Sequence, residues 1–176
     1  MGIVDALGAD VTSTRIGQRI AHHSDLRRQC GLAQYAVAEA AVLAAVPARL
    51  DAVAAAALPC AAMTAYQAVV RRLRVEPGDT VLVTGGAGGV GGFAVQLASL
   101  AGGHVIATAS TWNADHVLGL GAHEVFDYHS EDIAALVACR RLVMVHLTGR
   151  LVSGRFLPLC QIGLLLWVRR RSGRSG

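Results

Sequence analysis

From residue 80 to about residue 147, short apolar runs rich in β-branched residues alternate with longer runs of helical period. Strands are expected at 80–84, 104–109, 124–127 and 142–147, and helices at 91–101, 114–120 and 131–138. This alternation is typical of βαβ units, in which helices link the parallel strands of one sheet. The pattern therefore predicts an α/β fold with a parallel sheet.

Residues 1–79 follow a different pattern. The first half is punctuated by glycines and holds short apolar runs such as 33–37, which predict small β-strands. The segment 50–73 is rich in alanine and helical in period, and Pro77-Gly78-Asp79 predicts a turn into the strand that follows. We therefore expect small strands, then a helix, before the parallel sheet begins.

A glycine-rich loop, TGGAGGVGG, stands between the expected strand at 80–84 and the helix after it. Gly86, Gly88 and Gly91 satisfy G-x-G-x-x-G, whose glycines allow a tight turn, an approach of backbone to pyrophosphate, and close helix–strand packing. A helix N-terminus also favours anions. The candidate phosphate-binding residues are Gly86, Ala87, Gly88, Gly89, Val90 and Gly91; a glycine-rich turn without a ligand is the alternative.

The end of the second strand bears on the choice of dinucleotide. An NAD site usually has an acid there, about 20 residues past the glycines, to hold the ribose hydroxyls. Here the segment 107–113 contains no acid that would repel a 2′-phosphate, and Ser110, Thr111 and Asn113 can donate hydrogen bonds to one. The sequence favours NADPH and leaves NADH open, since no basic residue stands at this point. Trp112 and Asp115 are interpreted as surface residues of the following helix.

Composition excludes disorder, because 53% of the 176 residues are hydrophobic and only 16% are charged. All 16 basic residues are arginine; eight of them and all 12 acids fall in residues 1–132, and the other eight arginines lie beyond. The basic tail at 140–176 could contact nucleic acid or an anionic surface. No base-stacking pattern accompanies it, so we expect a solvated tail and no specific nucleic-acid partner.

Cysteine usage and hydropathy bear on the compartment. The four cysteines, at 30, 60, 139 and 160, are far apart and form no C-x-x-C, which favours a reducing, cytoplasmic location with free thiols. The membrane candidate that we identify, 156–168, has 13 residues and contains Pro158 and Gln161. A spanning helix needs about 20 apolar residues, so no membrane span is expected.

Several motifs in the same order resemble those of the medium-chain dehydrogenase/reductase superfamily, in particular its quinone oxidoreductase-like, zinc-independent branch. The resemblance covers about residues 2–137. It rests on Gly17-Gln18-Arg19-Ile20, Gly31-Leu32-Ala33-Gln34-Tyr35-Ala36, the segment 55–66, Pro77-Gly78-Asp79-Thr80 leading into the glycine loop, Leu120-Gly121-Ala122 and Asp127-Tyr128.

The resemblance implies a partial GroES-like β-barrel for substrate at 1–50, a helical connection at 51–79 and a partial Rossmann domain, with a doubly wound parallel sheet, at 80–139. An unrecognised arginine-rich tail follows at 140–176. It implies NADPH-dependent hydride transfer to a quinone or to an activated alkene or carbonyl, in a family whose members often form homo-oligomers. By position, Thr64 would lie near the nicotinamide as the catalytic residue, and Tyr128 near the adenosine phosphate. Both residues could equally be ordinary packing residues.

Zinc is the main alternative, because the alcohol dehydrogenase branch holds a catalytic zinc. Such a site needs three protein ligands, and the candidates here are Cys60, His22, His23 and Cys30. The family's first ligand, its Gly-His-Glu motif and its four-cysteine loop are not found in this sequence. We therefore interpret Cys60 as a buried, inert thiol and His22-His23 as part of a polar loop. A zinc-dependent alcohol dehydrogenase-like fragment stays an alternative.

The family pattern and the acids are lost together near residue 139. This coincidence suggests a truncated or frame-shifted product that keeps some dinucleotide affinity and has reduced or no turnover. A dinucleotide-binding module without catalysis is therefore the other alternative.

Overall fold

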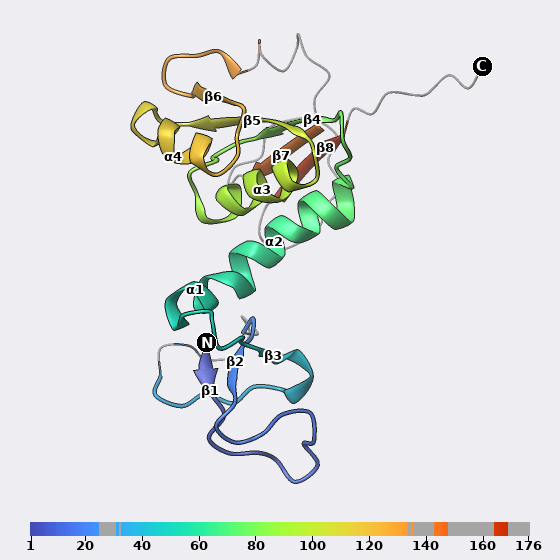
Figure 1. Ribbon diagram of the computed structural model, residues 1–176, viewed down its shortest axis with the longest axis vertical. Helices are drawn as coiled ribbons and strands as arrows, with labels where there is room; N and C mark the ends of the chain where they lie inside the picture. The colour runs from blue at the N-terminus through green and yellow to red at the C-terminus, as the bar shows by residue number, and fades with distance from the viewer. Residues whose placement is uncertain (25–30, 32, 134, 136–142, 148–163, 169–176) are drawn as a thin grey trace, which may run out of the picture. The chain divides into compact units, whose positions relative to one another are not determined.

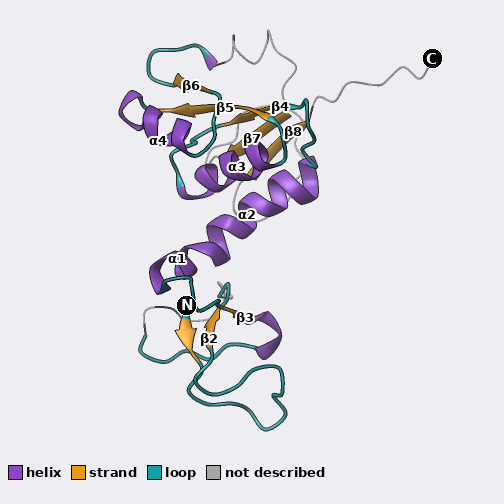
Figure 2. Cartoon of the chain, in the orientation of Figure 1, coloured by secondary structure: helices purple, strands orange, loops and turns teal. Residues whose placement is uncertain are grey.

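The computed structural model describes residues 1–24, 31, 33–133, 135, 143–147 and 164–168. The chain divides into two compact units, Met1–Ala61 and Ala62–Gly176. Figure 1 shows the course of the chain by residue number, and Figure 2 shows its helices and strands.

The first unit contains a small antiparallel sheet. Strand β2 (Arg19–Ala21) lies between β1 (Gly2–Ile3) and β3 (Ala44–Ala45), and a short 3-10 helix, η1 (Ala40–Val42), precedes β3. The strand expected at 33–37 does not form: residues 33 to 37 are irregular and exposed, with 96% of Val37 accessible. Apolar spacing alone cannot supply a pairing partner, and this segment has none among the described strands.

The helix expected over 50–73 is present as a continuous helical run, Ala52–Leu73. It consists of α1 (Ala52–Ala57), the π-helical η2 (Leu58–Ala62), α2 (Met63–Tyr66) and the π-helical η3 (Gln67–Leu73). Asp51 caps it: its Oδ1 accepts hydrogen bonds from the N–H groups of Val53 and Ala54, both at 2.9 Å. Arg74, in the left-handed conformation, ends it.

By length and apolar composition alone, this run is long enough to cross a membrane, a property that it shares with core helices of soluble proteins. The membrane candidate predicted at 156–168 lies outside the described residues up to residue 163, and its last five residues form strand β8 (Leu164–Val168).

The second unit is built on a five-stranded sheet in the order β6-β5-β4-β7-β8 (Figure 1). Strands β4 (Thr80–Val83), β5 (His104–Ala109), β6 (Glu124–Asp127) and β7 (Val143–Leu147) are parallel, and β8 pairs antiparallel with β7. The chain adds β5 and β6 on one side of β4 and then returns to its other side for β7. This reversal is the doubly wound arrangement that the family resemblance implied, and the parallel strands confirm the alternating pattern.

Two helices connect the parallel strands. Helix α3 (Gly89–Leu100) follows β4, and α4 (Ala114–Gly119) follows β5 after a 3-10 turn, η4 (Thr111–Asn113). The strands expected at 104–109 and 124–127 match β5 and β6, and those expected at 80–84 and 142–147 match β4 and β7 to within a residue. The helix expected at 131–138 falls largely outside the described residues.

The core of this unit follows from the alternation of side chains along the strands. Val81 and Val83 point into the larger apolar cluster, which includes Val95 and Ala98 of α3, whereas Leu82 packs with Ile106 of β5 in a second cluster. All of these side chains are fully buried. Both sheet faces are thus apolar, as expected for a parallel sheet.

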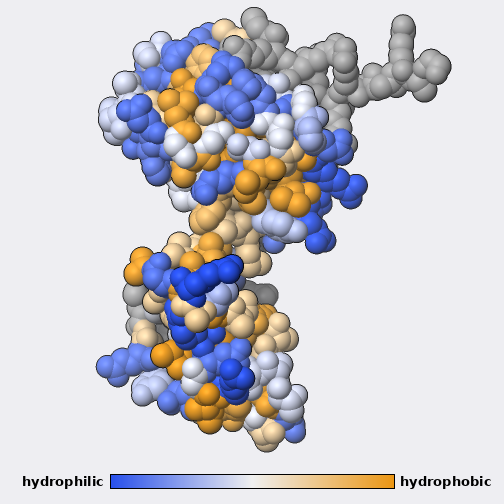
Figure 3. All heavy atoms as spheres, viewed as in Figure 1, coloured by the Kyte–Doolittle hydropathy of each residue, from blue (hydrophilic) through white to orange (hydrophobic). Residues whose placement is uncertain are grey.

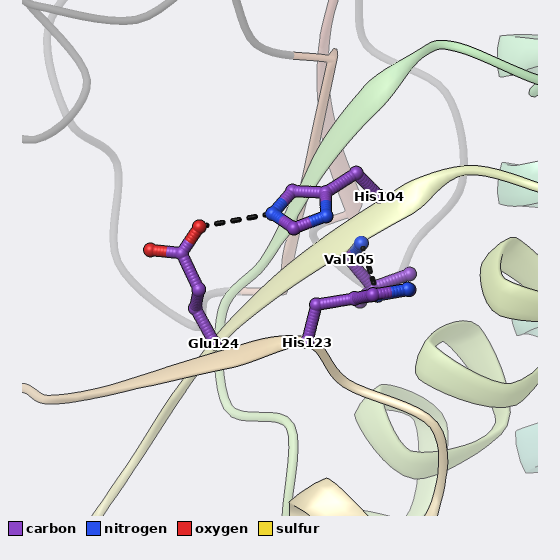
Figure 4. A network of polar contacts seen from close by, with 4 residues as sticks. All are labelled: His104, Val105, His123 and Glu124. Carbon is purple, nitrogen blue, oxygen red and sulfur yellow. Dashed lines mark hydrogen bonds and ion pairs between the residues drawn. The ribbon is translucent and has the colours of Figure 1, made fainter.

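Polar contacts join β5 and β6 at the amino-terminal edge of the sheet, where both strands begin (Figure 4). His104 Nε2 lies 2.9 Å from Glu124 Oε1. The N–H of Val105 donates to Nδ1 of His123 at 3.0 Å, and the N–H of His123 donates to the carbonyl of Val105 at 2.8 Å. These contacts fix the start of the β5–β6 pair and lie at the edge opposite to the glycine loop.

Candidate dinucleotide site

The candidate site lies where β4, β5 and β6 end. The three strands are parallel and adjacent, so their carboxyl ends meet at one edge of the sheet. The glycine loop follows β4, Ser110 follows β5 and Tyr128 follows β6. Ligands of doubly wound sheets bind at this edge, close to the strand at which the strand order reverses. Here that strand is β4.

The glycines of the loop are required by its geometry. Gly85, with φ +67°, makes the tight turn, whereas the motif predicted this role for Gly86. Gly86 is buried, and a Cβ on it would lie 2.9 Å from Cβ of Ala107 and 3.1 Å from Cγ1 of Val117. A Cβ on Gly91 would lie 2.0 Å from the carbonyl oxygen of Gly85. Side chains are therefore excluded where backbone and helix approach each other.

The first backbone N–H groups of helix α3 lie beside this loop and have no acceptor within the helix. Gly88 is its N-cap residue, and the first hydrogen bond of the helix runs from the N–H of Gly92 to the carbonyl of Gly88 at 2.7 Å. The N–H groups of Gly89, Val90 and Gly91 precede that bond and have no acceptor within the helix. A phosphate oxygen would satisfy such donors and would be favoured by the helix dipole. The predicted residues therefore fit a pyrophosphate.

Thr108 of β5 holds the loop in place, a role that the sequence analysis missed. Its Oγ1 accepts a hydrogen bond from the N–H of Gly85 at 3.0 Å, and its carbonyl accepts one from the N–H of Gly86 at 2.8 Å. The residue is 4% exposed. The signal available in the sequence was a threonine, flanked by alanines, at a buried position of an apolar strand.

Ser110 and Asn113, predicted to face a 2′-phosphate, do lie together. Nδ2 of Asn113 donates to Oγ of Ser110 at 3.0 Å, and the N–H of Asn113 donates to the carbonyl of Ser110 at 2.9 Å. Ser110 is buried and Asn113 half-buried. The Asn113 amide is thus already engaged, although it keeps a second N–H.

The segment 107–113 contains no acid, but an acid from the next strand bonds to it and takes up the donors of Thr111 that were predicted to face a 2′-phosphate. Asp127, the last residue of β6, accepts hydrogen bonds from the N–H of Thr111, at 3.2 Å, and from its hydroxyl. Its other oxygen accepts from the N–H of His129 at 2.9 Å. The acid comes from the neighbouring strand β6, so the sequence of the loop after β5 does not contain it.

These hydrogen bonds keep Asp127 ionised. The bond from the Thr111 hydroxyl, followed by that from the N–H of His129, lowers the pKa of the Asp127 carboxyl below its ordinary value. Asp127 therefore carries a full negative charge near neutral pH, beside the loop that contains Ser110.

Aromatic rings border the same edge. The ring of His129 lies between those of Tyr128 and Trp112, with centroids 4.4 Å and 6.1 Å apart. Trp112 is 78% exposed and Tyr128 51% exposed, and Figure 3 shows apolar side chains dispersed among polar ones on the visible surface. Trp112 and Asp115 are surface residues, as predicted.

Thr64, the predicted catalytic residue, is half-buried on α2, which packs against α3. Its catalytic role stays a prediction. The interpretation of Cys60 as buried is wrong, because its side chain is exposed. His22 and His23 lie in a loop after β2, as expected. Among the described residues, no three metal-binding side chains cluster to hold an ion.

No family model matches the chain, but individual proteins do. A chloroplastic quinone-oxidoreductase homolog of Spinacia oleracea is 37% identical over 142 residues, covering 78% of this chain and 43% of the relative. A chloroplast envelope quinone oxidoreductase homolog of Arabidopsis thaliana is 39% identical over 140 residues, covering 77% of this chain and 43% of the relative.

Solved structures agree. The quinone oxidoreductase from Coxiella burnetii superposes with a TM-score of 0.73 at 37% identity, covering 77% of this chain and 43% of that one. A mycobacterial protein complexed with NADPH superposes with a TM-score of 0.70 at 32% identity, covering 78% of this chain and 42% of that one. The chain thus spans less than half the length of the relatives it matches. It belongs to the medium-chain dehydrogenase/reductase superfamily, in its quinone oxidoreductase-like branch.

Proposed function

We propose that this chain binds a nicotinamide dinucleotide at the carboxyl ends of β4, β5 and β6 and serves hydride transfer to a quinone or to an activated alkene or carbonyl. The glycine loop is the observation that carries the proposal. A Cβ on Gly91 would collide with the carbonyl of Gly85, and the first N–H groups of α3, which begins at Gly89, have no acceptor within the helix. Relatives named quinone oxidoreductase and trans-enoyl reductase support the acceptor class.

The position of each residue indicates which part of the coenzyme it would contact. The N–H groups of Gly89, Val90 and Gly91 would bind the pyrophosphate, with Gly86, Ala87 and Gly88 shaping the approach of the backbone. Ser110, Asn113 and Tyr128 would face the adenosine end, and Thr64 would lie near the nicotinamide. When bound, the reduced coenzyme supplies a hydride, and the acceptor also takes up a proton to complete its reduction.

NADPH is the proposed coenzyme, with NADH also accepted. The donors of Ser110 and Asn113 and the phenol of Tyr128 support NADPH, and a relative that was solved with NADPH agrees in fold. Zinc has no part in this proposal. A cytoplasmic location and small-molecule partners complete it.

The test is a thermal shift with NADPH and NADH in parallel, followed by turnover with a simple quinone. A ligand at 100 times its dissociation constant stabilises the native state by about 2.7 kcal/mol. Stabilisation with quinone reduction supports the oxidoreductase. Stabilisation without reduction of quinones or enones points to the binding module, the second candidate. No shift with either coenzyme contradicts both.

A further inference from the structure

The carboxylate of Asp127 lies at the junction of two loops that the proposed site uses. It closes β6, directly before Tyr128, and bonds to the backbone and hydroxyl of Thr111, directly after Ser110. One acid thus links the loop after β5 to the turn after β6.

We infer that Asp127 is a specificity-determining residue that disfavours the 2′-phosphate of NADPH and thereby keeps NADH competitive. The inference rests on the proposed function, and it concerns the choice of coenzyme at that same site. The acid reaches the β5 loop from the neighbouring strand, so it acts where a dinucleotide fold usually carries its discriminating acid.

Two effects of the carboxylate combine. Its negative charge repels a dianionic phosphate placed near Ser110, and no arginine or lysine occurs between residues 75 and 139 to offset it. It also occupies the N–H and the hydroxyl of Thr111, two donors that a phosphate could otherwise use. Neither effect acts on NADH, which has a hydroxyl at that position.

Two further titratable residues contact Asp127 in the described part of the chain. Glu131 accepts a hydrogen bond from the N–H of Asp127 at 2.8 Å, which adds a second acid to the same turn. His129 donates its N–H to Oδ1 of Asp127 at 2.9 Å, and the charge of its protonated ring would offset that of the carboxylate. All affinities are therefore compared at one pH.

The test compares the affinities of the full-length wild type and of Asp127→Asn for NADPH and NADH, measured by coenzyme fluorescence at pH 8. Asparagine keeps the size of the side chain and an oxygen acceptor for Thr111. We expect the ratio of affinities to shift toward NADPH by about threefold to tenfold, as for removal of one solvent-exposed charge beside a dianion. The shift should shrink as salt is raised, because salt screens exposed charges.

The matched control is Glu124→Gln. It removes the same charge from the same strand, at the opposite edge of the sheet, and should leave the ratio unchanged. Asp127→Ser is the second variant at this position, and it removes the charge and keeps a short acceptor. If either Asp127→Asn or Asp127→Ser does not fold, the affinities of the other variant still test the inference. Wild-type protein supplies a measurement that needs no variant, since its own ratio should move toward NADPH with salt.

The outcomes separate the inference from the function on which it rests. Binding of both coenzymes, with a ratio that neither variant nor salt changes, would overturn the role of Asp127 alone. An equal shift in Glu124→Gln would also overturn it, by showing a general effect of net charge. Failure of the wild type to bind either coenzyme would overturn the proposed function and this inference with it.

Discussion

Gly91 and Gly85 are in backbone contact: a Cβ added to Gly91 would lie 2.0 Å from the carbonyl oxygen of Gly85 and 2.8 Å from its carbonyl carbon. The partner atoms belong to backbone, which cannot rotate away as a side chain would. The first turn of α3 and the turn after β4 are therefore fitted to each other, and the donors at the helix start depend on this fit.

Gly91→Ala should consequently displace the loop. The overlap exceeds ordinary overpacking, which costs about 1–3 kcal/mol, so we expect a loss of at least about 3 kcal/mol together with loss of coenzyme protection. Gly119→Ala is the control, because a Cβ there meets nothing within 4 Å and helical alanine is neutral or slightly stabilising. Chemical denaturation measures both; a Gly91→Ala variant of wild-type stability would refute the packing argument.

Thr108→Val should loosen the loop without changing the volume of the side chain much. The variant removes the acceptor for the N–H of Gly85, and loss of one such hydrogen bond costs about 1 kcal/mol. Coenzyme affinity should fall with it, because the loop that carries the phosphate donors is less well held. Thr108→Ser retains the hydroxyl and should recover most of the affinity. Equal affinities of the two variants would show that this hydrogen bond does not position the loop.

The sequence predicted the strands of the second unit well, because β4, β5 and β6 are short β-branched or alanine-rich runs bounded by turns. It failed at 33–37, an apolar run that stays irregular and pairs with none of the described strands. Within TGGAGGVGG it also could not tell which glycine has positive φ, since that depends on how Gly85 meets Thr108. The role of Asp127 was not predicted, because its contact with Thr111 joins the ends of two neighbouring strands. The spacing of residues along the chain does not show which strand ends are neighbours.

Acid should destabilise the protein through Asp127 and Asp51. The hydrogen bond from the Thr111 hydroxyl to Asp127, and that from the N–H of Ala54 to Asp51, lower the pKa of each carboxyl from its ordinary value of 3.8. A folded pKa below the unfolded one adds stability above pH 3.8, and this stability is lost as pH falls through the lowered value.

The measurement is the midpoint of thermal unfolding between pH 7 and pH 2. Asp127→Asn and Asp51→Asn should each lower the midpoint at pH 7 and flatten the decline in acid, because the titrating group is gone. Glu76→Gln, at a carboxyl for which the structure gives no such bond to its side chain, serves as control. Parallel curves for all four proteins would contradict the assignment of the acid sensitivity to these two residues.

Arg19 should hold the small sheet of the first unit together. Its guanidinium donates to the carbonyls of Pro47, Ala48 and Leu50, with Nη2 at 2.6 Å from the last, and thus ties β2 to the segment that follows β3. Arg19→Met keeps most of the apolar stem and removes the donors, and hydrogen bonds from a charged group at a partly exposed site are worth about 1–2 kcal/mol. Lysine cannot reproduce the planar fork, so Arg19→Lys should recover little.

Hydrogen exchange resolved by segment is the appropriate readout, because the two units can open separately. We expect faster exchange at 19–21 and 44–50 in Arg19→Met and unchanged exchange in β4 and β5. Arg15→Met is the control: Arg15 is exposed and contributes its backbone N–H to Gln18, at 3.2 Å, a bond that the substitution leaves in place. Equal acceleration in both variants would assign the effect to loss of charge, whereas acceleration confined to Arg19→Met would assign it to the three carbonyl contacts.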